Sequence, residues 1–519
     1  MTAPHEVDDL IELLTRAARR WPDKTAWIFD TTGTRFTFAE IDRRSGELAI
    51  ALSGLGVRPG DRVAVMLRNE PEFPLLWLAL AKLGGVLVPV NTNYRELDGT
   101  HVLRHSGARF AVAAPEFTGL LTSIAPDTGL ERVLTPDELL AEAGPRPDWT
   151  VFWTEGERPV NIQYTSGTTG APKGCVLTHR YWITLARSLA TEFPAVSDED
   201  IMLTAQPFHY IDPQWNVALG LASGATLVVL DRFHPSTFWA KVREYGVTWF
   251  YCLGLMPTLL LRQPETPDDR RHRVRAISAS AIPRELHATL EERWGVPWFE
   301  AFGMTETGGD IRMSPADHDE TVGTGCIGRP SPHREAMIAD ASGNPVPRGE
   351  TGELVLRGIG LMHGYHDDPE ATARAFAGGW FHTGDLARMD ESGRIFYLGR
   401  TKDMIRRSGE NVSADEVERA LLLHPDVRMA AVIGVPDELR GEEIKAFVVL
   451  SGEKNREDVP PEDLAEFCAA KLAYFKVPRY WAHVDELPLT PSERVAKGEL
   501  RKAVDHLSGT YDRVERRWR

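Results

Sequence analysis

Cysteine is scarce in this sequence, and its few copies lie far apart. Only four of the 519 residues are cysteines, at positions 175, 252, 326 and 468, and none forms a CxxC pair. Disulfide frameworks and zinc sites usually need several cysteines at short spacing. We therefore expect neither, and the composition suits a reducing compartment.

Long apolar runs are also missing. The first ten residues, MTAPHEVDDL, are acidic and contain no apolar segment, so we expect no signal peptide. The most apolar stretch, residues 73–90, is interrupted by Lys82, a glycine pair and Pro89, which favours a core helix and a buried strand over a membrane span. The sequence thus predicts a cytoplasmic protein that does not cross a membrane.

Positive charge is in deficit. Lysine and arginine number 59 against 75 aspartates and glutamates, so the formal net charge is −16. A chain this acidic is, as a whole, a poor partner for nucleic acid or anionic lipid. Any phosphate group must therefore be bound by a few local cations, and we expect no nucleic-acid partner.

Length and pattern predict an α/β protein with two domains. The chain is too long for a single core. Short β-rich runs alternate with helical stretches, which predicts layered sheets covered by helices. From about residue 345, frequent turns indicate a β-rich, barrel-like part, and a new α/β pattern follows residues 399–403. We predict an N-terminal domain over 1–401 and a small mobile α+β domain over 402–519, with the hinge at Lys402.

Two local signals refine this pattern. Ser413 and Glu416 have the spacing of a capping box at the start of a helix. Residues 390–393, DESG, predict a hairpin turn.

Residues 164–174, YTSGTTGAPKG, carry the strongest local signal for chemistry. Glycines allow backbone N–H groups to approach an anion closely, hydroxyls add donors, and Lys173 adds a cation. The preceding strand would place the segment at a sheet edge, and the spacing is not that of a Walker loop. The alternative is a flexible loop that is merely rich in serine, glycine and threonine.

Two further segments are suggestive. In residues 299–309, FEAFGMTETGG, Glu306 can hold a hard cation such as Mg²⁺, and Thr305 can contact a phosphate oxygen. In residues 379–403, Asp385 follows a glycine and can accept both hydroxyls of a ribose. Its alternative role is to shape a tight turn.

Together these segments resemble the adenylate-forming superfamily of acyl-CoA synthetases, adenylation domains and firefly luciferase. The resemblance covers about residues 8–505 and includes the hinge segment GRTKDMIRRSGENVSADEVE. FHYIDPQWN, SGENVSADEVE and EEIKAFVVL are similar to the crotonobetaine/carnitine–CoA ligase group. The family joins a carboxylate to ATP, releasing pyrophosphate, and then transfers the acyl group to a thiol, which implies ATP, Mg²⁺ and coenzyme A.

The resemblance also implies roles for individual residues. The triphosphate contacts would be Thr165, Ser166, Gly167, Thr168, Thr169 and Lys173, with Thr305 on the α-phosphate and Glu306 on the magnesium. The remaining nucleotide contacts would be Ser280, Ala281, Phe302, Gly303, Met304, Asp385, Tyr397 and Arg400. Phe302 stands where many relatives carry tyrosine, and the segment of Ser280 and Ala281 has fewer glycines than usual. Lys402 would be the hinge, and Gly409 would border the thiol tunnel.

Three residues are candidates for the acid pocket. His209 falls where the family has an aromatic residue or histidine that gates the pocket, and the alternative is a core histidine. Asp212 would bind a cationic substrate group or cap a helix beginning near Pro213. Trp215 would be pocket wall or core.

Residues 487–502, LPLTPSERVAKGELRK, depart from the family pattern PxTxSGKIxR. Glu493 replaces the glycine, and Arg494 replaces the lysine that bridges the carboxylate and the α-phosphate. Arg494 can perform the same task through paired N–H groups. Lys497 is the alternative catalytic cation, and a third possibility is that neither residue acts.

We therefore predict an AMP-forming acid–CoA ligase whose partners are a small acid and a thiol; a homodimer is left open. The departure at Arg494 keeps two adenylating alternatives: a carrier-protein loader and an enzyme that activates nitrite to diazotise an amine. A weakened homologue that only binds or regulates is a third alternative, disfavoured by the intact motifs.

Overall fold

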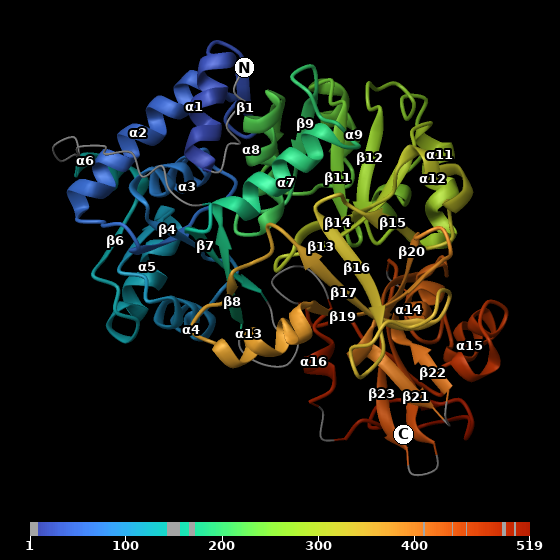
Figure 1. Ribbon diagram of the computed structural model, residues 1–519. Helices are drawn as coiled ribbons and strands as arrows, with labels where there is room; N and C mark the ends of the chain where they lie inside the picture. The colour runs from blue at the N-terminus through green and yellow to red at the C-terminus, as the bar shows by residue number, and fades with distance from the viewer. Residues whose placement is uncertain are drawn as a thin grey trace. The chain divides into compact units, whose positions relative to one another are not determined.

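The computed structural model describes residues 9–142, 156–165, 172–407, 410–437, 440–452, 454–489, 495–502 and 505–519. The chain forms two compact units (Figure 1). Unit 1 contains the chain up to Thr165, Ala171–Ala336 and Leu356–Phe381. Unit 2 contains Met337–Val355 and His382–Arg519. The division falls within three strands, β16 (Arg334–Ala339), β17 (Thr351–Gly358) and β19 (Phe381–Met389).

One sheet of unit 1 has a parallel centre with antiparallel strands at both sides. Parallel pairing joins β1 to β10, β9, β11, β12 and β13 in that order, whereas β2, β14 and β15 pair antiparallel. The strands in spatial order are β2 (Thr34–Thr37), β1 (Thr25–Phe29), β10 (Thr226–Val229), β9 (Ile201–Thr204), β11 (Trp249–Leu253), β12 (Ala276–Ser280), β13 (Trp298–Met304), β14 (Gly308–Arg312) and β15 (Cys326–Pro330).

A second sheet of unit 1 carries the strands beside YTSGTTGAPKG. Its order is β18 (Gly364–Tyr365), β8 (Lys173–Thr178), β7 (Pro159–Thr165), β4 (Val86–Pro89), β3 (Arg62–Met66), β5 (Phe110–Ala113) and β6 (Arg132–Leu134). β7 and β8 form an antiparallel pair that ends at Thr165 opposite Lys173. The predicted strand before the motif is therefore confirmed.

Helices cover these sheets. They are α1 (Leu10–Arg20), α2 (Phe38–Leu55), α3 (Glu72–Leu83), α4 (Glu96–Ser106), α5 (Pro115–Ile124), α6 (Pro136–Ala141), α7 (His179–Thr191), α8 (Ile211–Ser223), α9 (Phe238–Glu244), α10 (Met256–Leu261), α11 (His287–Trp294), α12 (Pro315–Thr321) and α13 (Pro369–Ala375), with short 3₁₀ turns η1 (Ala125–Asp127), η2 (Arg284–Leu286) and η3 (Ala377–Gly379).

A buried polar contact ties α3 and α7 to β7. The indoles of Trp77 and Trp182 both donate to the side-chain oxygen of Asn161, at 2.8 and 3.0 Å. All three side chains are buried, so the asparagine satisfies two indole donors inside an apolar core. This contact holds the strand that leads to Thr165. The helix and strand predicted over 73–90 are α3 and β4.

Unit 2 contains the β19–β20 hairpin and a sheet with helices. β20 (Ile395–Arg400) pairs with β19 across the predicted DESG turn. The sheet contains β22 (Glu410–Ser413), β21 (Met404–Arg407), β24 (Gly441–Leu450), β25 (Tyr480–His483), β26 (Tyr511–Asp512) and β27 (Arg517–Trp518), and β23 (Val427–Asp437) pairs with β24. The helices and 3₁₀ turns are α14 (Ala414–Leu422), α15 (Pro461–Ala469), α16 (Lys497–Leu500), η4 (Thr401–Asp403) and η5 (Tyr474–Lys476).

The predicted capping box of α14 is wrong in its contacts. Ser413 is the N-cap residue, but its side chain makes no capping hydrogen bond. The carboxylate of Glu416 instead pairs with Lys476 at 2.7 Å. A tertiary ion pair has therefore replaced the local contact. Among the described residues, no helix is both long and apolar enough to cross a membrane.

Candidate functional site

Lys173 begins β8 and lies against an aromatic ring. Its ammonium is 4.9 Å from the ring centre of Tyr365, on the neighbouring strand β18, within range of a cation–π contact. The hydroxyl of Tyr365 donates to Glu306 Oε1 at 3.1 Å. One tyrosine thus contacts both the predicted phosphate cation and the predicted magnesium ligand. Ser166, Gly167, Thr168 and Thr169 lie outside the described residues.

Thr305 and Glu306 lie in the tight turn between β13 and β14. Glu306 is largely buried, and its backbone oxygen accepts from Met362 at 2.8 Å. Gly303 faces the backbone across the turn, where an added Cβ would stand 1.9 Å from the carbonyl oxygen of Gly308. Only glycine allows this approach. Gly303 therefore sets the path of the turn that presents Thr305 and Glu306.

A buried ion pair anchors the end of this turn. Asp310 Oδ1 accepts from Arg334 Nε at 2.5 Å, and both side chains are almost fully buried. Arg334 also donates to the backbone oxygen of Thr307 at 2.5 Å and to that of Gly360 at 3.2 Å. Burial raises the pKa of Asp310, although Arg334 acts in the opposite direction. Arg334 thus fixes the turn to the segment that leads into β18.

The segment with Ser280 and Ala281 follows the end of β12. Ala281 has a φ of +67°, a left-handed conformation in which alanine is strained relative to glycine. The next residue, Ile282, donates its N–H to Glu300 Oε1 at 2.7 Å. Ser280 donates to the carbonyl oxygen of Ala301, next to Phe302, at 2.7 Å. The adenine residues predicted from two separate motifs therefore lie on neighbouring, bonded strands.

His209 is buried directly before α8. Its backbone oxygen accepts from Gln163 on β7 at 2.5 Å, and its ring packs against Tyr210. Among the described residues, neither ring nitrogen has a hydrogen-bond partner. Burial lowers the pKa of His209 to about 3, so the ring is neutral. The ring is thus neutral and lies beside β7, and neither of its nitrogens has a hydrogen-bond partner among the described residues. Its role as a gate of the acid pocket stays a prediction.

Asp212 lies inside the first turn of α8 and is not its N-cap. The N-cap position is Tyr210, and it makes no side-chain capping bond, so the alternative of a cap by Asp212 is wrong. Asp212 Oδ1 instead accepts from the indole of Trp215 at 3.3 Å. Trp215 in turn meets the edge of Tyr251 with ring centres 5.5 Å apart. The hydroxyl of Tyr251 contacts that of Ser280 at 2.5 Å, so this group borders the adenine segment.

The residues predicted to bind the ribose are joined within unit 2. Asp385 and Arg400 face each other across β19 and β20, and Asp385 Oδ1 accepts from Arg400 Nε at 2.8 Å. Tyr397 donates its hydroxyl to the same oxygen at 3.2 Å. Burial, followed by the nearby Asp385 carboxylate, raises the pKa of Tyr397 well above its usual range. The phenol therefore stays a donor, and an anionic carboxylate is held in the interior.

Lys497 is enclosed by carboxylates of unit 2. Its ammonium is 2.8 Å from Glu418, 3.3 Å from Asp415 and 3.9 Å from Asp403. Burial would lower the pKa of Lys497, but these carboxylates raise it overall. Burial also raises the pKa of Glu418 to about 7, against the pull of the lysine.

This arrangement links Lys497 to the hinge segment, since Asp403 follows Lys402 in η4. Arg501 adds a second ion pair to Asp403, at 2.8 Å. Arg494 and Gly409 lie outside the described residues, as does the side chain of Lys402. Lys497 as the alternative catalytic cation stays a prediction.

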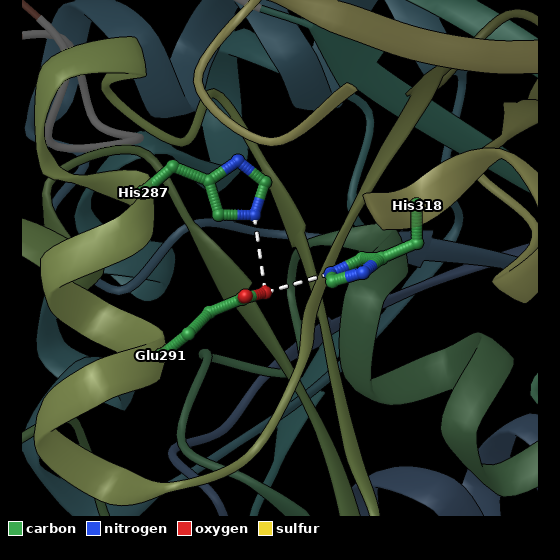
Figure 2. Close-up of side chains that lie close together, drawn as sticks. All are labelled: His287, Glu291 and His318. Carbon is green, nitrogen blue, oxygen red and sulfur yellow. Dashed lines mark hydrogen bonds and ion pairs between the residues drawn. The ribbon is translucent and has the colours of Figure 1, made fainter. Parts of the chain in front are cut away.

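Three further side chains meet away from these segments. His287 and Glu291 on α11 point toward His318 on α12 (Figure 2), and one ligand-type atom of each lies within 4.8 Å of the others. Histidine and carboxylate are common metal ligands, so the hydrogen bonds of each ring decide the assignment.

Those hydrogen bonds occupy the ring nitrogens. His287 Nε2 lies 2.8 Å from the carbonyl oxygen of Trp298; because a carbonyl only accepts, this nitrogen carries a proton. His318 lies between Glu291 at 2.7 Å and Asp319 at 2.9 Å. The hydrogen bond to Glu291, opposed by burial and aided by Asp319, raises the pKa of His318. We assign the group as an ion-paired histidine cluster.

Comparison with known proteins decides the family. Residues 14–366 match the AMP-binding enzyme family, and residues 416–494 match the AMP-binding enzyme C-terminal domain. The chain belongs to the AMP-binding enzyme family. A crotonobetaine/carnitine–CoA ligase of Salmonella typhi is 34% identical over 511 residues, which cover 93% of this chain and 97% of that relative. Its counterpart in Salmonella arizonae is 35% identical over 507 residues, covering 93% and 96%.

Solved structures agree. The o-succinylbenzoate CoA synthetase of Bacillus subtilis, in complex with its acyl-adenylate intermediate, matches with a TM-score of 0.85 at 28% identity, covering 95% of this chain and 98% of that chain. An anthranilate CoA ligase in complex with anthranoyl-AMP matches with a TM-score of 0.86 at 26% identity, covering 96% and 97%. These findings confirm the family and fold class predicted from the motifs and support an acid–CoA ligase over the alternatives.

Sequence reasoning missed several residues of this AMP-binding enzyme. Tyr365 lies in a two-residue strand, and Arg334 reaches Asp310 from 24 positions away, so no local pattern announces either contact. Tyr251 could have been found, because its hydroxyl is a polar exception at the centre of the otherwise apolar parallel strand β11, and a buried hydroxyl needs a partner.

Proposed function

We propose that this protein activates a carboxylic acid with Mg-ATP, giving an acyl adenylate and pyrophosphate, and then transfers the acyl group to coenzyme A with release of AMP. One observation carries the proposal: Tyr365 contacts both Lys173 and Glu306, so the cation and the carboxylate predicted to serve the triphosphate meet at one side chain. The family match and the acid–CoA ligase relatives support the same conclusion.

The chemistry follows from charge. The acid's carboxylate oxygen attacks the α-phosphorus, the bond to the bridging oxygen breaks, and pyrophosphate leaves. Such a transfer depends mostly on positioning and on neutralising the phosphate oxygens. Lys173 would neutralise the outgoing phosphates, Thr305 would donate to the α-phosphate, and Glu306 would hold Mg²⁺, an ion that prefers carboxylate oxygens. Glu306 is a turn carboxylate already held by one phenolic hydrogen bond, which fits a ligand of fixed orientation.

Asp385 and Arg400 would serve the ribose. A carboxylate can accept from two vicinal hydroxyls, and Arg400 keeps it ionised and oriented. In the second half-reaction the thiol sulfur attacks the acyl carbon, the mixed anhydride breaks, and AMP leaves with its phosphate. Arg494 would neutralise the carboxylate and α-phosphate during the first step only.

For the acid, we propose a small carboxylate that bears a cationic nitrogen. Asp212 supplies a negative charge, and the adjoining rings of Trp215 and Tyr251 are aromatic groups whose faces bind quaternary ammonium groups. The names of the Salmonella relatives support the same class.

The test is a panel of acids and nitrite, each assayed for pyrophosphate, AMP and acyl-CoA with and without coenzyme A. We expect AMP with crotonobetaine or carnitine, acyl-CoA only when coenzyme A is present, and weaker activity with uncharged acids of the same size. Asp212→Asn should erase the preference for the charged acid while leaving KM for ATP unchanged. ADP as the nucleotide product, or AMP formed only with nitrite, would overturn the proposal.

A further inference from the structure

The segment predicted to contact the triphosphate lies between the end of β7 and the start of β8. Tyr164 and Thr165 are the last residues of β7, and Pro172 directly precedes Lys173, the first residue of β8. Thr165 and Lys173 are the last partners of the ladder. Whatever sets the spacing of these two strand ends also sets where Lys173 presents its ammonium.

Helix α4 contacts both strand ends through two histidines. His101 Nε2 lies 3.0 Å from the carbonyl oxygen of Pro172, and His105 Nδ1 lies 2.8 Å from the hydroxyl of Tyr164. The two residues are four apart, hence on one helix face, and their rings stack with centres 5.5 Å apart. Figure 1 shows α4 beside the lower part of β8. One rigid helix therefore holds both ends of the segment.

The protons on these rings can be assigned from their partners. The carbonyl oxygen of Pro172 only accepts, so Nε2 of His101 carries a proton and donates it. Burial, and then the neighbouring His101, lowers the pKa of His105. A neutral His105 keeps one nitrogen for the Tyr164 hydroxyl. Each histidine thus needs one particular nitrogen for its contact.

Further contacts connect His105 to Lys173 and Glu306, the residues predicted to serve the triphosphate and its magnesium. His366 packs edge-on against His105, with ring centres 5.5 Å apart, and its backbone N–H donates to the carbonyl oxygen of Gly174 at 2.7 Å. The preceding Tyr365 lies under the Lys173 ammonium and donates to Glu306. A continuous set of contacts therefore runs from α4 to both triphosphate ligands.

The histidine pair is only partly buried. A cavity of about 710 Å³ borders both rings and is lined also by Thr100, Arg104 and Asp127. Rings next to such a space can turn unless their hydrogen bonds fix them. The cavity also gives substituted side chains room, so variants at these positions should fold.

We propose that His101 and His105 are positioning residues for ATP: by holding the two ends of the YTSGTTGAPKG segment to α4, they set the position of Lys173 relative to Glu306. The inference rests on the proposed function, because it assumes that Lys173 and Glu306 serve ATP. It assigns to α4 a part in nucleotide binding without contact to the nucleotide.

The test exploits the geometry of the two ring nitrogens. A glutamine amide reaches the position of Nε2, and an asparagine amide reaches that of Nδ1. His101→Gln and His105→Asn should keep near wild-type KM for ATP. His101→Asn, His105→Gln and the leucine variants should raise KM for ATP about fivefold each, the value expected for one lost hydrogen bond, with less change in kcat and none in KM for the acid.

His287→Leu serves as the control, because it removes a buried histidine that is hydrogen-bonded to a backbone carbonyl outside the segment. It should lower Tm without changing KM for ATP. The rise in Tm on adding ATP is measured for every variant, because it reports ATP binding independently of catalysis. If the wild type binds ATP but makes no AMP, only the proposed function is rejected. Equal KM values in all α4 variants, or failure of His101→Gln and His105→Asn to restore binding, would overturn the positioning role.

Discussion

At the scale of single residues, Asp385 combines burial with a negative charge. Its side chain is almost inaccessible and is held by Arg400 and Tyr397 on the opposite strand. A buried carboxylate is costly unless it is paired, and here the pairing leaves the acid oriented for a further donor. The ribose hydroxyls are donors of the required kind.

Asp385→Asn should raise KM for ATP about 10- to 100-fold, because a charge-assisted hydrogen bond contributes about 1.5–3 kcal/mol. Asp390→Asn is the matched control: this carboxylate also pairs with an arginine of the same hairpin, Arg394, but it lies in the DESG turn. Titrating ATP in the pyrophosphate assay distinguishes the two. Equal effects of both substitutions would indicate damage to the hairpin and not a lost ribose contact.

Arg494 and Lys497 should separate cleanly by experiment. Arg494→Ala should slow adenylation strongly and leave transfer from a supplied acyl adenylate nearly intact, and Arg494→Lys should retain substantial activity. Lys497→Met should instead destabilise unit 2 by about 3–5 kcal/mol, because it leaves Glu418, Asp415 and Asp403 without their buried cation. Denaturant unfolding and both half-reactions are measured for each variant. If Arg494→Ala keeps full adenylation activity while Lys497→Met is stable but inactive, Lys497 and not Arg494 is the catalytic cation.

At the scale of elements, the α11–α12 contact depends on a charged histidine. The folded pKa of His318 is raised, so its contribution to stability is complete below its unfolded pKa of about 6.5 and is lost as pH rises through the folded pKa. Burial would raise the pKa of Glu291, but hydrogen bonds from His287, His318 and the Trp298 backbone lower it to about 2. Its contribution is therefore present above its ordinary value of 4.5 and lost as pH falls toward 2.

His318→Gln should consequently cost about 1.5–3 kcal/mol near pH 6 and much less near pH 9. Denaturant unfolding of wild type and variant at both pH values measures the difference. His234→Gln, at an exposed ion pair with Asp231, should show little effect at either pH. A pH-independent cost at His318 would mean that ring packing, and not charge, joins the two helices.

The predicted hinge at Lys402 is also tested at the scale of elements. Lys402→Pro fixes one φ angle in η4 and should hinder rotation of the small domain. We expect adenylation to be largely kept and transfer to coenzyme A to be lost. Glu391→Pro, in the exposed DESG turn where proline is well tolerated, controls for a new proline nearby. Equal loss of both half-reactions would place the hinge elsewhere.

The sequence predicted those elements that local pattern determines. Strand β7, the helix and strand over 73–90 and the DESG turn follow from periodicity and turn residues, and the motif spacing led to the family. It failed where a distant side chain competes with a local partner. Glu416 pairs with Lys476, 60 positions away, and not with the start of α14, and no local window shows that competitor. The cap, one of the two roles predicted for Asp212, also failed, but for a local reason, because the indole of Trp215, three residues further on, donates to this carboxylate inside the helix.

At the scale of the whole molecule, contacts within each unit are well defined, but the proposed reaction needs residues of both. Lys173 and Glu306 belong to unit 1, whereas Asp385, Arg400 and Lys497 belong to unit 2. If these residues act as proposed, activity would depend on how the units come together in each half-reaction. Trapping one arrangement should separate the two steps, as the Lys402 variant is designed to do.

The burial of the native thiols would allow the predicted movement of the small domain to be tested by fluorescence. All four cysteines are buried, and burial raises the pKa of Cys175 and Cys252 well above the usual range and that of Cys468 to about 12. Maleimide dyes react with exposed thiolates, so the wild-type chain should label poorly. Cysteines introduced at Leu140 in unit 1 and Val514 in unit 2, both exposed, would then carry a donor and an acceptor dye in an otherwise native background. Energy transfer between them should change when ATP and the acid are added and change again with coenzyme A.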